Sequence, residues 1–227
     1  MKRICARMEA SAHQHEPRWH AAVFTLAAIA LYVTLPNRVA FGPLWLMPLL
    51  VSAMLVPLLL ISPVRREETR FQRWLSIALI ATLNVFNLAT LVELVATLLG
   101  TKRHLGGSEL LIAGVQIWLT NIIVFGLWFW EIDGDGPAQR AHVSGLTPRS
   151  DFVFPQMSLP EDLRNPEWRT KVVDYMYLAF TNATAFSPTD TYPLTRRAKA
   201  LMTVEGFTSL VTIAIIAGRS VNILNGG

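Results

Sequence analysis

The apolar residues of this chain fall into blocks that are long enough to cross a lipid bilayer. A hydrocarbon core about 30 Å thick needs roughly 20 apolar residues in a helix that rises about 1.5 Å per residue. Five blocks qualify as predicted spans: 19–35, 41–64, 74–99, 109–130 and 198–224. Only 16% of the residues are charged, against about 25% in a typical soluble domain. The sequence therefore predicts an all-α, polytopic transmembrane helix bundle.

Composition along the chain predicts four regions. A polar N-terminal tail (1–18) precedes a four-helix transmembrane region (19–130), which is followed by a polar, proline-rich connector (131–171). The last region (172–227) contains a short apolar helix at 172–187, a sharp break and the final span. Sixteen helical residues reach about 24 Å, so this sixth helix either crosses the bilayer or re-enters, and the side of the C-terminus stays open with it.

The distribution of basic residues predicts the orientation. Lysine and arginine concentrate in short cytoplasmic loops of membrane proteins. The tail and the loop after the second span carry Lys2, Arg3, Arg7, Arg18, Arg65, Arg66, Arg70 and Arg73, whereas the opposite loops carry Arg38, Lys102 and Arg103. We therefore expect a cytoplasmic N-terminus and a cytoplasmic connector.

Other functional classes lack support in the sequence. Cys5 is the only cysteine, which excludes an intrachain disulfide and a thiolate metal cluster. The net charge of +4 comes without a basic face or module for nucleic acid. No catalytic or nucleotide-binding motif is found, so we predict no enzyme, no cofactor and no metal site. Asp133 and Asp135 are interpreted as a solvated turn.

Polar residues inside the predicted spans are candidates for function, because they are costly in lipid. In the third span Asn84, Asn87, Thr90 and Glu93 follow one another at steps of three, and the fourth span contains Thr120 and Asn121. One interpretation is a water-filled path, and the other is hydrogen bonding between helices. For the amides we favour packing, and for the carboxyl of Glu93 we favour function.

The final span contains a similar polar face. Glu205, Thr212 and Arg219 are spaced seven residues apart and share one side of the helix. An intramembrane carboxyl needs water, a partner or a bound proton. Glu205 is therefore a functional candidate.

The segment from Asp174 to Thr195 resembles the pore module of potassium channels, which consists of a pore helix, a selectivity filter and an inner helix. The family filter reads Thr-Val-Gly-Tyr-Gly-Asp and is typically followed by two residues, Pro, one residue and Thr. Asp190, Pro193 and Thr195 match that tail in register, and Thr184 matches the threonine before the filter. Glu205 falls where such channels often have a glutamate. The whole chain is also similar to a group of uncharacterised bacterial inner-membrane proteins with a comparable Tyr-x-Ala-Phe-Thr segment.

The filter positions themselves differ from that family. They read Ala185, Phe186, Ser187, Pro188 and Thr189, without either glycine. A potassium filter uses backbone carbonyls and needs glycine where the backbone turns left-handed. The resemblance thus implies a homo-oligomeric pore, with four subunits by analogy, that conducts a monovalent cation without a standard potassium filter. Thr184–Asp190 would form its constriction, and Glu205, Thr212 and Arg219 would line its inner helix.

Three functional classes follow for this membrane protein. The first is the cation-conducting oligomer. The second is a proton-linked secondary transporter that uses Glu93 or Glu205. The third is a structural or assembly protein whose connector, residues 131–171, binds a cytoplasmic partner. In the packing alternative to a conducting pore, Thr181, Asn182 and Thr184 satisfy backbone groups at a helix end and the break after them is an ordinary capped turn.

Overall fold

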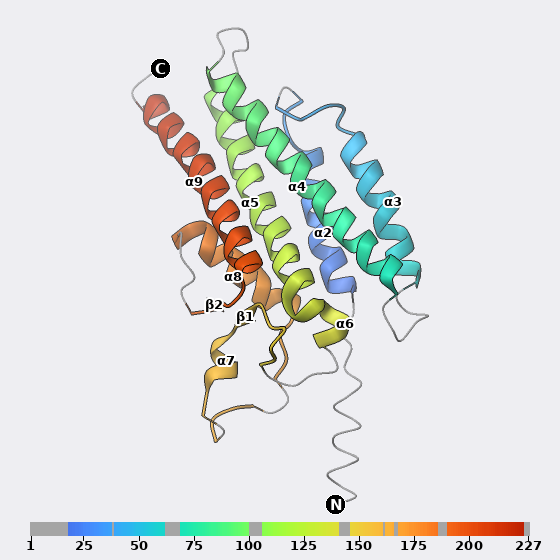
Figure 1. Cartoon of the computed structure of the whole chain (residues 1–227). Coiled ribbons are helices and arrows are strands. Elements are labelled where there is room, and N and C mark those ends of the chain that lie inside the picture. Colours follow the sequence, from blue (N-terminus) through green and yellow to red (C-terminus); the bar gives the residue numbers. More distant parts are fainter. Residues whose placement is uncertain are drawn as a thin grey trace, which may run out of the picture.

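The computed structural model is a bundle of helices, and it describes residues 18–37, 39–61, 69–99, 106–140, 146–160, 162–165, 168–185 and 190–224. The long elements are α2 (Trp19–Val33), α3 (Leu46–Ile61), α4 (Arg70–Leu99), α5 (Gly107–Ile132), α8 (Val172–Ala185) and α9 (Arg196–Leu224). Between α5 and α8 lie the short elements η1 (Asp133–Asp135), α6 (Pro137–Arg140), β1 (Phe152–Val153) and α7 (Pro155–Ser158). Figure 1 shows α2, α3, α4, α5 and α9 running side by side. The all-α prediction is confirmed.

Three of the described helices are long and apolar enough to cross a membrane. They cover Arg70–Leu99, Gly107–Asp135 and Arg196–Gly218. The helices α2 and α3 are apolar but have only 15 and 16 residues, less than the roughly 20 that a full crossing needs. Helix length therefore does not support the predicted count of five spans.

The second predicted span begins later than its apolar block suggests. Helix α3 starts at Leu46 rather than at residue 41. Gly42 has a φ of +73°, which is outside the helical region, and Pro43 lacks the N–H of a helical residue and biases its predecessor toward extended backbone. The five residues before Leu46 are consequently turn and coil, and this shortens the helix.

Helix α5 is the centre of the bundle, and it packs against α2, α4, α8 and α9. Its residues Ile117, Val124, Phe125, Leu127 and Phe129 are all almost completely buried. Helix α3 packs on α4 and α2 at the edge. The central position of α5 means that its C-terminal end organises the polar elements that follow it.

Helix α5 ends in a left-handed turn that sends the chain back toward the bundle. Gly134, Asp135 and Gly136 have φ values of +58°, +64° and +103°, which glycine adopts freely and aspartate tolerates. The connector then returns over the end of α5, where Phe152 packs edge-on against Phe129 at 5.3 Å between ring centroids. Phe154 packs in the same way on Tyr175 of α8 at 5.2 Å. Part of the connector is therefore a folded cap on the bundle.

Candidate functional site

Helix α8 rises from one end of the bundle toward its middle. We call this the connector end, because α5 finishes there and α9 begins there. Near the start of α8, the Tyr175 hydroxyl donates to Asp133 Oδ2 at the end of α5, at 2.5 Å. Two turns further along, Asn182 Nδ2 donates to Glu205 Oε2 at 2.7 Å. Glu205 lies nine residues into α9, which corresponds to about 13 Å from its start. The two contacts place the two ends of α8 at different depths of the bundle.

The chain after α8 comes back to the connector end. The return segment, residues 190–195, contains β2 (Tyr192–Pro193), which pairs antiparallel with β1, with Phe152 opposite Pro193 and Val153 opposite Tyr192. The Leu194 N–H donates to the Asp151 carbonyl at 2.8 Å. Helix α9 then leaves the connector end alongside α5 (Figure 1). In the described residues, α8 enters the bundle and the chain returns to the end from which it started.

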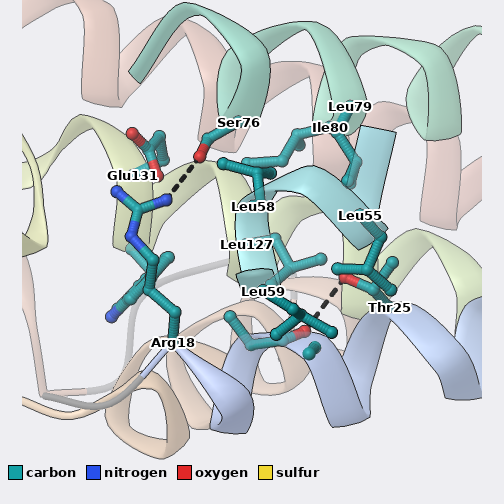
Figure 2. Close-up of a pocket in the computed structure, with 13 residues that line it drawn as sticks. Arg18, Thr25, Leu55, Leu58, Leu59, Ser76, Leu79, Ile80, Leu127 and Glu131 are labelled. Atoms are coloured by element: carbon teal, nitrogen blue, oxygen red, sulfur yellow. Dashed lines mark hydrogen bonds between the residues drawn. The ribbon is translucent and has the colours of Figure 1, made fainter. Parts of the chain in front are cut away.

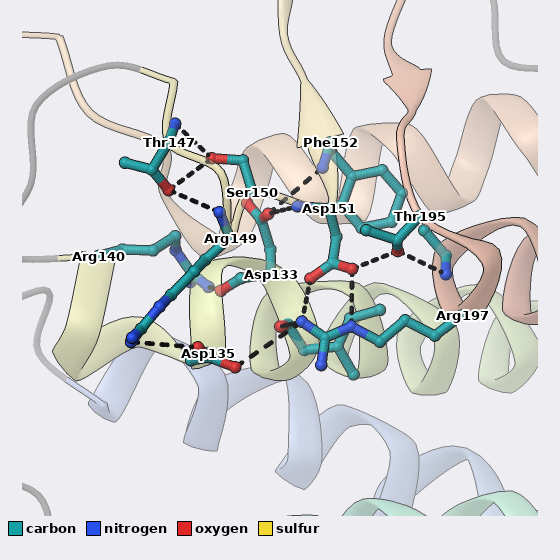
Figure 3. A network of polar contacts seen from close by, with 12 residues as sticks. Asp133, Asp135, Arg140, Thr147, Arg149, Ser150, Asp151, Phe152, Thr195 and Arg197 are labelled. Atoms are coloured by element: carbon teal, nitrogen blue, oxygen red, sulfur yellow. Dashed lines mark hydrogen bonds and ion pairs between the residues drawn. The ribbon is translucent and has the colours of Figure 1, made fainter.

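A cluster of charged side chains fastens the return segment to the connector (Figure 3). Asp151 is fully buried, and its two carboxylate oxygens accept from Arg197 Nε at 2.7 Å and Nη2 at 2.6 Å. The Thr195 hydroxyl donates to the same carboxylate. A bidentate arginine–carboxylate pair is among the stronger ionic contacts in proteins because two charge-assisted bonds act together. We call Asp151, Thr195 and Arg197 the clasp.

Asp133 is buried next to the clasp, so its interpretation as part of a solvated turn is wrong. Its side chain accepts from the backbone N–H groups of Asp151 at 2.7 Å and Phe152 at 3.3 Å, in addition to the Tyr175 hydroxyl. The Tyr175 phenol is protonated at neutral pH, so its hydroxyl is the donor in this contact. Asp133 therefore joins the end of α5 to both the connector and α8.

Asp135 adds an ionic layer that is more exposed to solvent. Its carboxylate lies 3.5 Å from Arg149, 3.8 Å from Arg197 and 3.9 Å from Arg73. The side chains of Arg149 and Arg197 are 73% and 48% exposed, so screening by water and salt weakens these contacts. Arg73 also donates to the Asp135 carbonyl, which ties the start of α4 to the same end.

The filter-like stretch is described only at its two flanks. Thr184, Ala185 and Asp190 are exposed on the surface of the chain; Phe186, Ser187, Pro188 and Thr189 lie outside the described residues. Thr184 donates to the Phe180 carbonyl and Thr181 to the Leu178 carbonyl, which is the backbone role that the packing alternative assigned to these threonines. Asn182 differs, because it crosses to α9.

The polar face of α9 points into the chain's own core. Glu205, Ser209 and Thr212 are each 0% exposed, whereas the large hydrophobic side chains of Val204, Phe207 and Leu210, in the described part of the helix, are exposed. The side chain of Arg219 lies outside the described part of the helix. Glu93 on α4 is half-buried. Glu205 and Thr212 therefore both face the chain's own interior, and their role as a pore lining stays a prediction.

Amide side chains connect three helices in the interior. Asn121 Nδ2 of α5 donates to Ser209 Oγ of α9 at 3.0 Å, and Asn87 Nδ2 of α4 donates to the side-chain Oδ1 of Asn121 at 3.4 Å. All three side chains are buried. This is the interhelical hydrogen bonding that the packing interpretation of the amides describes.

A small cavity lies elsewhere, at the connector end between α2, α3, α4 and α5 (Figure 2). Its volume is about 40 Å³, enough for a very small number of water molecules. The walls are mainly apolar, with Arg18, Thr25, Ser76 and Glu131 supplying the polar part, and Arg18 Nη1 donates to Ser76 Oγ at 2.6 Å. The described filter-like residues, Thr184, Ala185 and Asp190, do not line it.

Comparisons with protein-family models, with curated proteins and with solved structures give no match. The resemblance to a potassium-channel pore module accordingly rests on the residues of this chain alone. Within the described ranges, no three His, Cys, Asp or Glu side chains come together as metal ligands.

The sequence interpretation missed Asp151 and the role of Asn182. Asp151 lies in a polar connector and pairs with Arg197, which is 46 residues away, and no periodicity connects the two. Asn182 carried a detectable signal: it lies seven residues after Tyr175, so both belong to the buried face of α8. An amide on the buried face of an apolar helix indicates a partner on a neighbouring helix.

Proposed function

We propose that the chain is a multi-pass inner-membrane protein with a cytoplasmic connector end, in which α2, α3, α4, α5 and α9 cross and α8 re-enters. The connector adds Arg140, Arg149, Arg164, Arg169 and Lys171 to the end that already holds the basic tail and the loop between α3 and α4, as the positive-inside rule favours. The short α2 and α3 are accommodated by local thinning of the bilayer, at a modest cost per ångström of mismatch.

We further propose that copies of this chain assemble into a cation-conducting pore. The observation that carries the proposal is the course of the described residues on either side of 186–189: α8 enters the bundle, residues 190–195 lie at the connector end, and Thr184 and Asp190 are exposed. Tyr177 and Phe180 share the outward face of α8 with Thr184 and are about half exposed, which leaves this face available to a neighbouring copy.

The electrostatics of the entering helix favour a cation. The C-terminal end of an α-helix has a partial negative charge and carbonyl groups without intrahelical partners. Helix α8 ends at Ala185, within the filter-like stretch, and the Asp190 carboxylate follows later in the same stretch. A cation at this point would interact favourably with both, whereas an anion would be repelled.

The topology is testable with single cysteines in a background where Cys5 is replaced by serine. We expect Lys102→Cys, between α4 and α5, to react with a membrane-impermeant maleimide in spheroplasts. Arg164→Cys in the connector and Tyr192→Cys in the return segment are expected to react only after permeabilisation. Labelling of Tyr192→Cys from outside while Arg164→Cys stays protected would contradict a re-entrant α8.

The pore is testable by potassium and sodium flux in liposomes that contain the purified protein. We expect flux above that of empty vesicles, and roughly a tenfold reduction for Asp190→Asn at low ionic strength, because the carboxylate concentrates cations near the entrance. Asp162→Asn, which alters an exposed carboxylate of the connector, is the control and should leave flux unchanged. Flux of neither ion above that of empty vesicles would refute the proposal and favour the transporter or assembly alternatives.

A further inference from the structure

The carboxyl of Glu205 is buried in the middle of the bundle and only half satisfied. The side chain is 0% exposed. Its Oε2 accepts from Asn182 at 2.7 Å, whereas Oε1 has no hydrogen-bond partner. Asn182 is itself 4% exposed and also donates to the Met202 carbonyl at 2.9 Å. A carboxyl with one oxygen bonded and the other unpartnered has a vacant position for a proton.

No described cation lies close enough to neutralise an ionised Glu205. On α9 itself Arg196, Arg197 and Lys199 precede Glu205 by at least six residues, or about 9 Å along the axis, and Arg219 follows it by fourteen residues, or about 21 Å. Arg197 is occupied by Asp151 at the connector end. The ion pairs that Asp135 and Asp151 form with Arg73, Arg149 and Arg197 lie at that end of the bundle.

The neighbouring helices also present neutral groups at this depth. Helix α5 faces Glu205 with Asn121, whose Nδ2 lies 3.4 Å from the Glu205 carbonyl. The ionisable residues of α5, Glu109 and Glu131, are at least ten residues away along that helix, or about 15 Å. Helix α5 therefore offers no counter-charge to the carboxyl.

Helices α8 and α4 also offer no counter-charge to the Glu205 carboxyl. Helix α8 faces Glu205 with Asn182, and its only carboxyl, Asp174, is eight residues earlier, about 12 Å. Its tyrosines, Tyr175 and Tyr177, are neutral donors. Helix α4 reaches this region through Asn87. The ionisable groups along α4 are Arg70, Arg73 and Glu93. The nearest of them to Asn87 is Glu93, six residues further along the helix.

We propose that Glu205 is an intramembrane proton-binding site, with the proton on Oε1 while Oε2 remains the acceptor for Asn182. An isolated carboxylate in an apolar interior has a very large desolvation cost, and binding a proton removes the charge. The Asn182 contact is compatible with the protonated form, because the carbonyl oxygen of a carboxylic acid still accepts a hydrogen bond. The site joins α8 to α9 directly, so its proton is bound at the contact that holds the entering helix in the bundle.

Infrared difference spectroscopy of the full-length protein in liposomes tests this proposal. The spectrum of the wild type minus that of Glu205→Gln should contain the C=O stretch of a protonated carboxyl at neutral pH. Asn182→Leu should shift this band to higher frequency, because the carbonyl loses its donor. Ser209→Ala, which removes a neighbouring buried hydroxyl, should retain the band.

A carboxylate band in place of the protonated band, at every pH from acidic to mildly alkaline, would overturn the proposal. If Glu205→Gln fails to accumulate, Glu205→Asp provides the same information: in protein with ¹³C-labelled glutamate, the band shifts in the wild type but not in the Asp variant. The measurement needs no ion flux, so it is independent of whether the chain forms a pore.

Discussion

Replacing Asp151 with alanine is expected to destabilise the protein by about 2–3 kcal/mol. The substitution removes both bonds to Arg197 and the acceptor of the Thr195 hydroxyl. Loss of one partner of a buried ion pair costs about 3–5 kcal/mol, and we reduce that figure because the Arg197 side chain is 48% exposed and can be solvated. For a protein of this size the expected fall in melting temperature is roughly 5–10 °C.

The measurement is thermal unfolding in detergent, followed by tryptophan fluorescence. Asp162→Ala is the matched control, because it removes an exposed carboxylate from the same connector and should change the free energy of unfolding by no more than about 0.5 kcal/mol. A double-mutant cycle with Arg197→Ala should give a coupling energy of about 1 kcal/mol or more. Additive effects in that cycle would show that the clasp is not a cooperative contact.

The helices of this chain were predictable because helix formation depends on residues that are close together in the sequence. Blocks of apolar residues gave the long helices to within a few residues: the third was expected at 74–99 and is Arg70–Leu99, and the fourth at 109–130 and is Gly107–Ile132. Errors arose where backbone chemistry overrides hydropathy. The turn at Gly42 and Pro43 shortens α3 although the residues around it are apolar.

The site was only partly predictable because its contacts are distant in sequence. The resemblance in register at Asp190, Pro193 and Thr195 singled out the return segment, and in the structure this segment does follow an entering helix. The partner of Thr195, however, is Asp151, 44 residues earlier. Neither hydropathy nor turn chemistry contains information about such a pair, and the same holds for the pairing of β1 with β2.

The spacing of residues along α9 also could not predict that its polar face is buried inside the chain. A spacing of seven places Glu205 and Thr212 on one side of a helix, but it does not say whether that side faces a neighbouring helix, lipid or an axis between copies. The structure places it against α5, through the contact of Asn121 with Ser209. An amide on one helix and a hydroxyl on another can be matched only when the packing is known.

Replacing Gly126 with leucine is expected to be the most damaging change in the spanning helices. Gly126 lies at a close approach of α5 and α8: an added Cβ would lie 2.5 Å from Met176 Sδ, 3.0 Å from its Cε and 3.2 Å from its Cα. The sulfur can move, but the Cα is backbone, so α8 itself would have to shift. Overpacking of this kind costs typically 1–3 kcal/mol, and the backbone contact places Gly126→Leu at about the upper end of that range.

Gly206→Leu provides the matched control, because an added Cβ at Gly206 on α9 meets nothing within 4 Å. It should be neutral or slightly stabilising, since leucine is the better helix former by somewhat less than about 1 kcal/mol.

Both variants are compared by melting temperature and by the amount recovered in the membrane fraction. Because α8 forms the Asn182 contact to Glu205, Gly126→Leu should also alter the infrared band assigned to Glu205, whereas Gly206→Leu should not. Equal stability of the two variants would mean that α8 does not need its close approach to α5, and that the entering helix is held by the clasp and the Asp133 contacts alone.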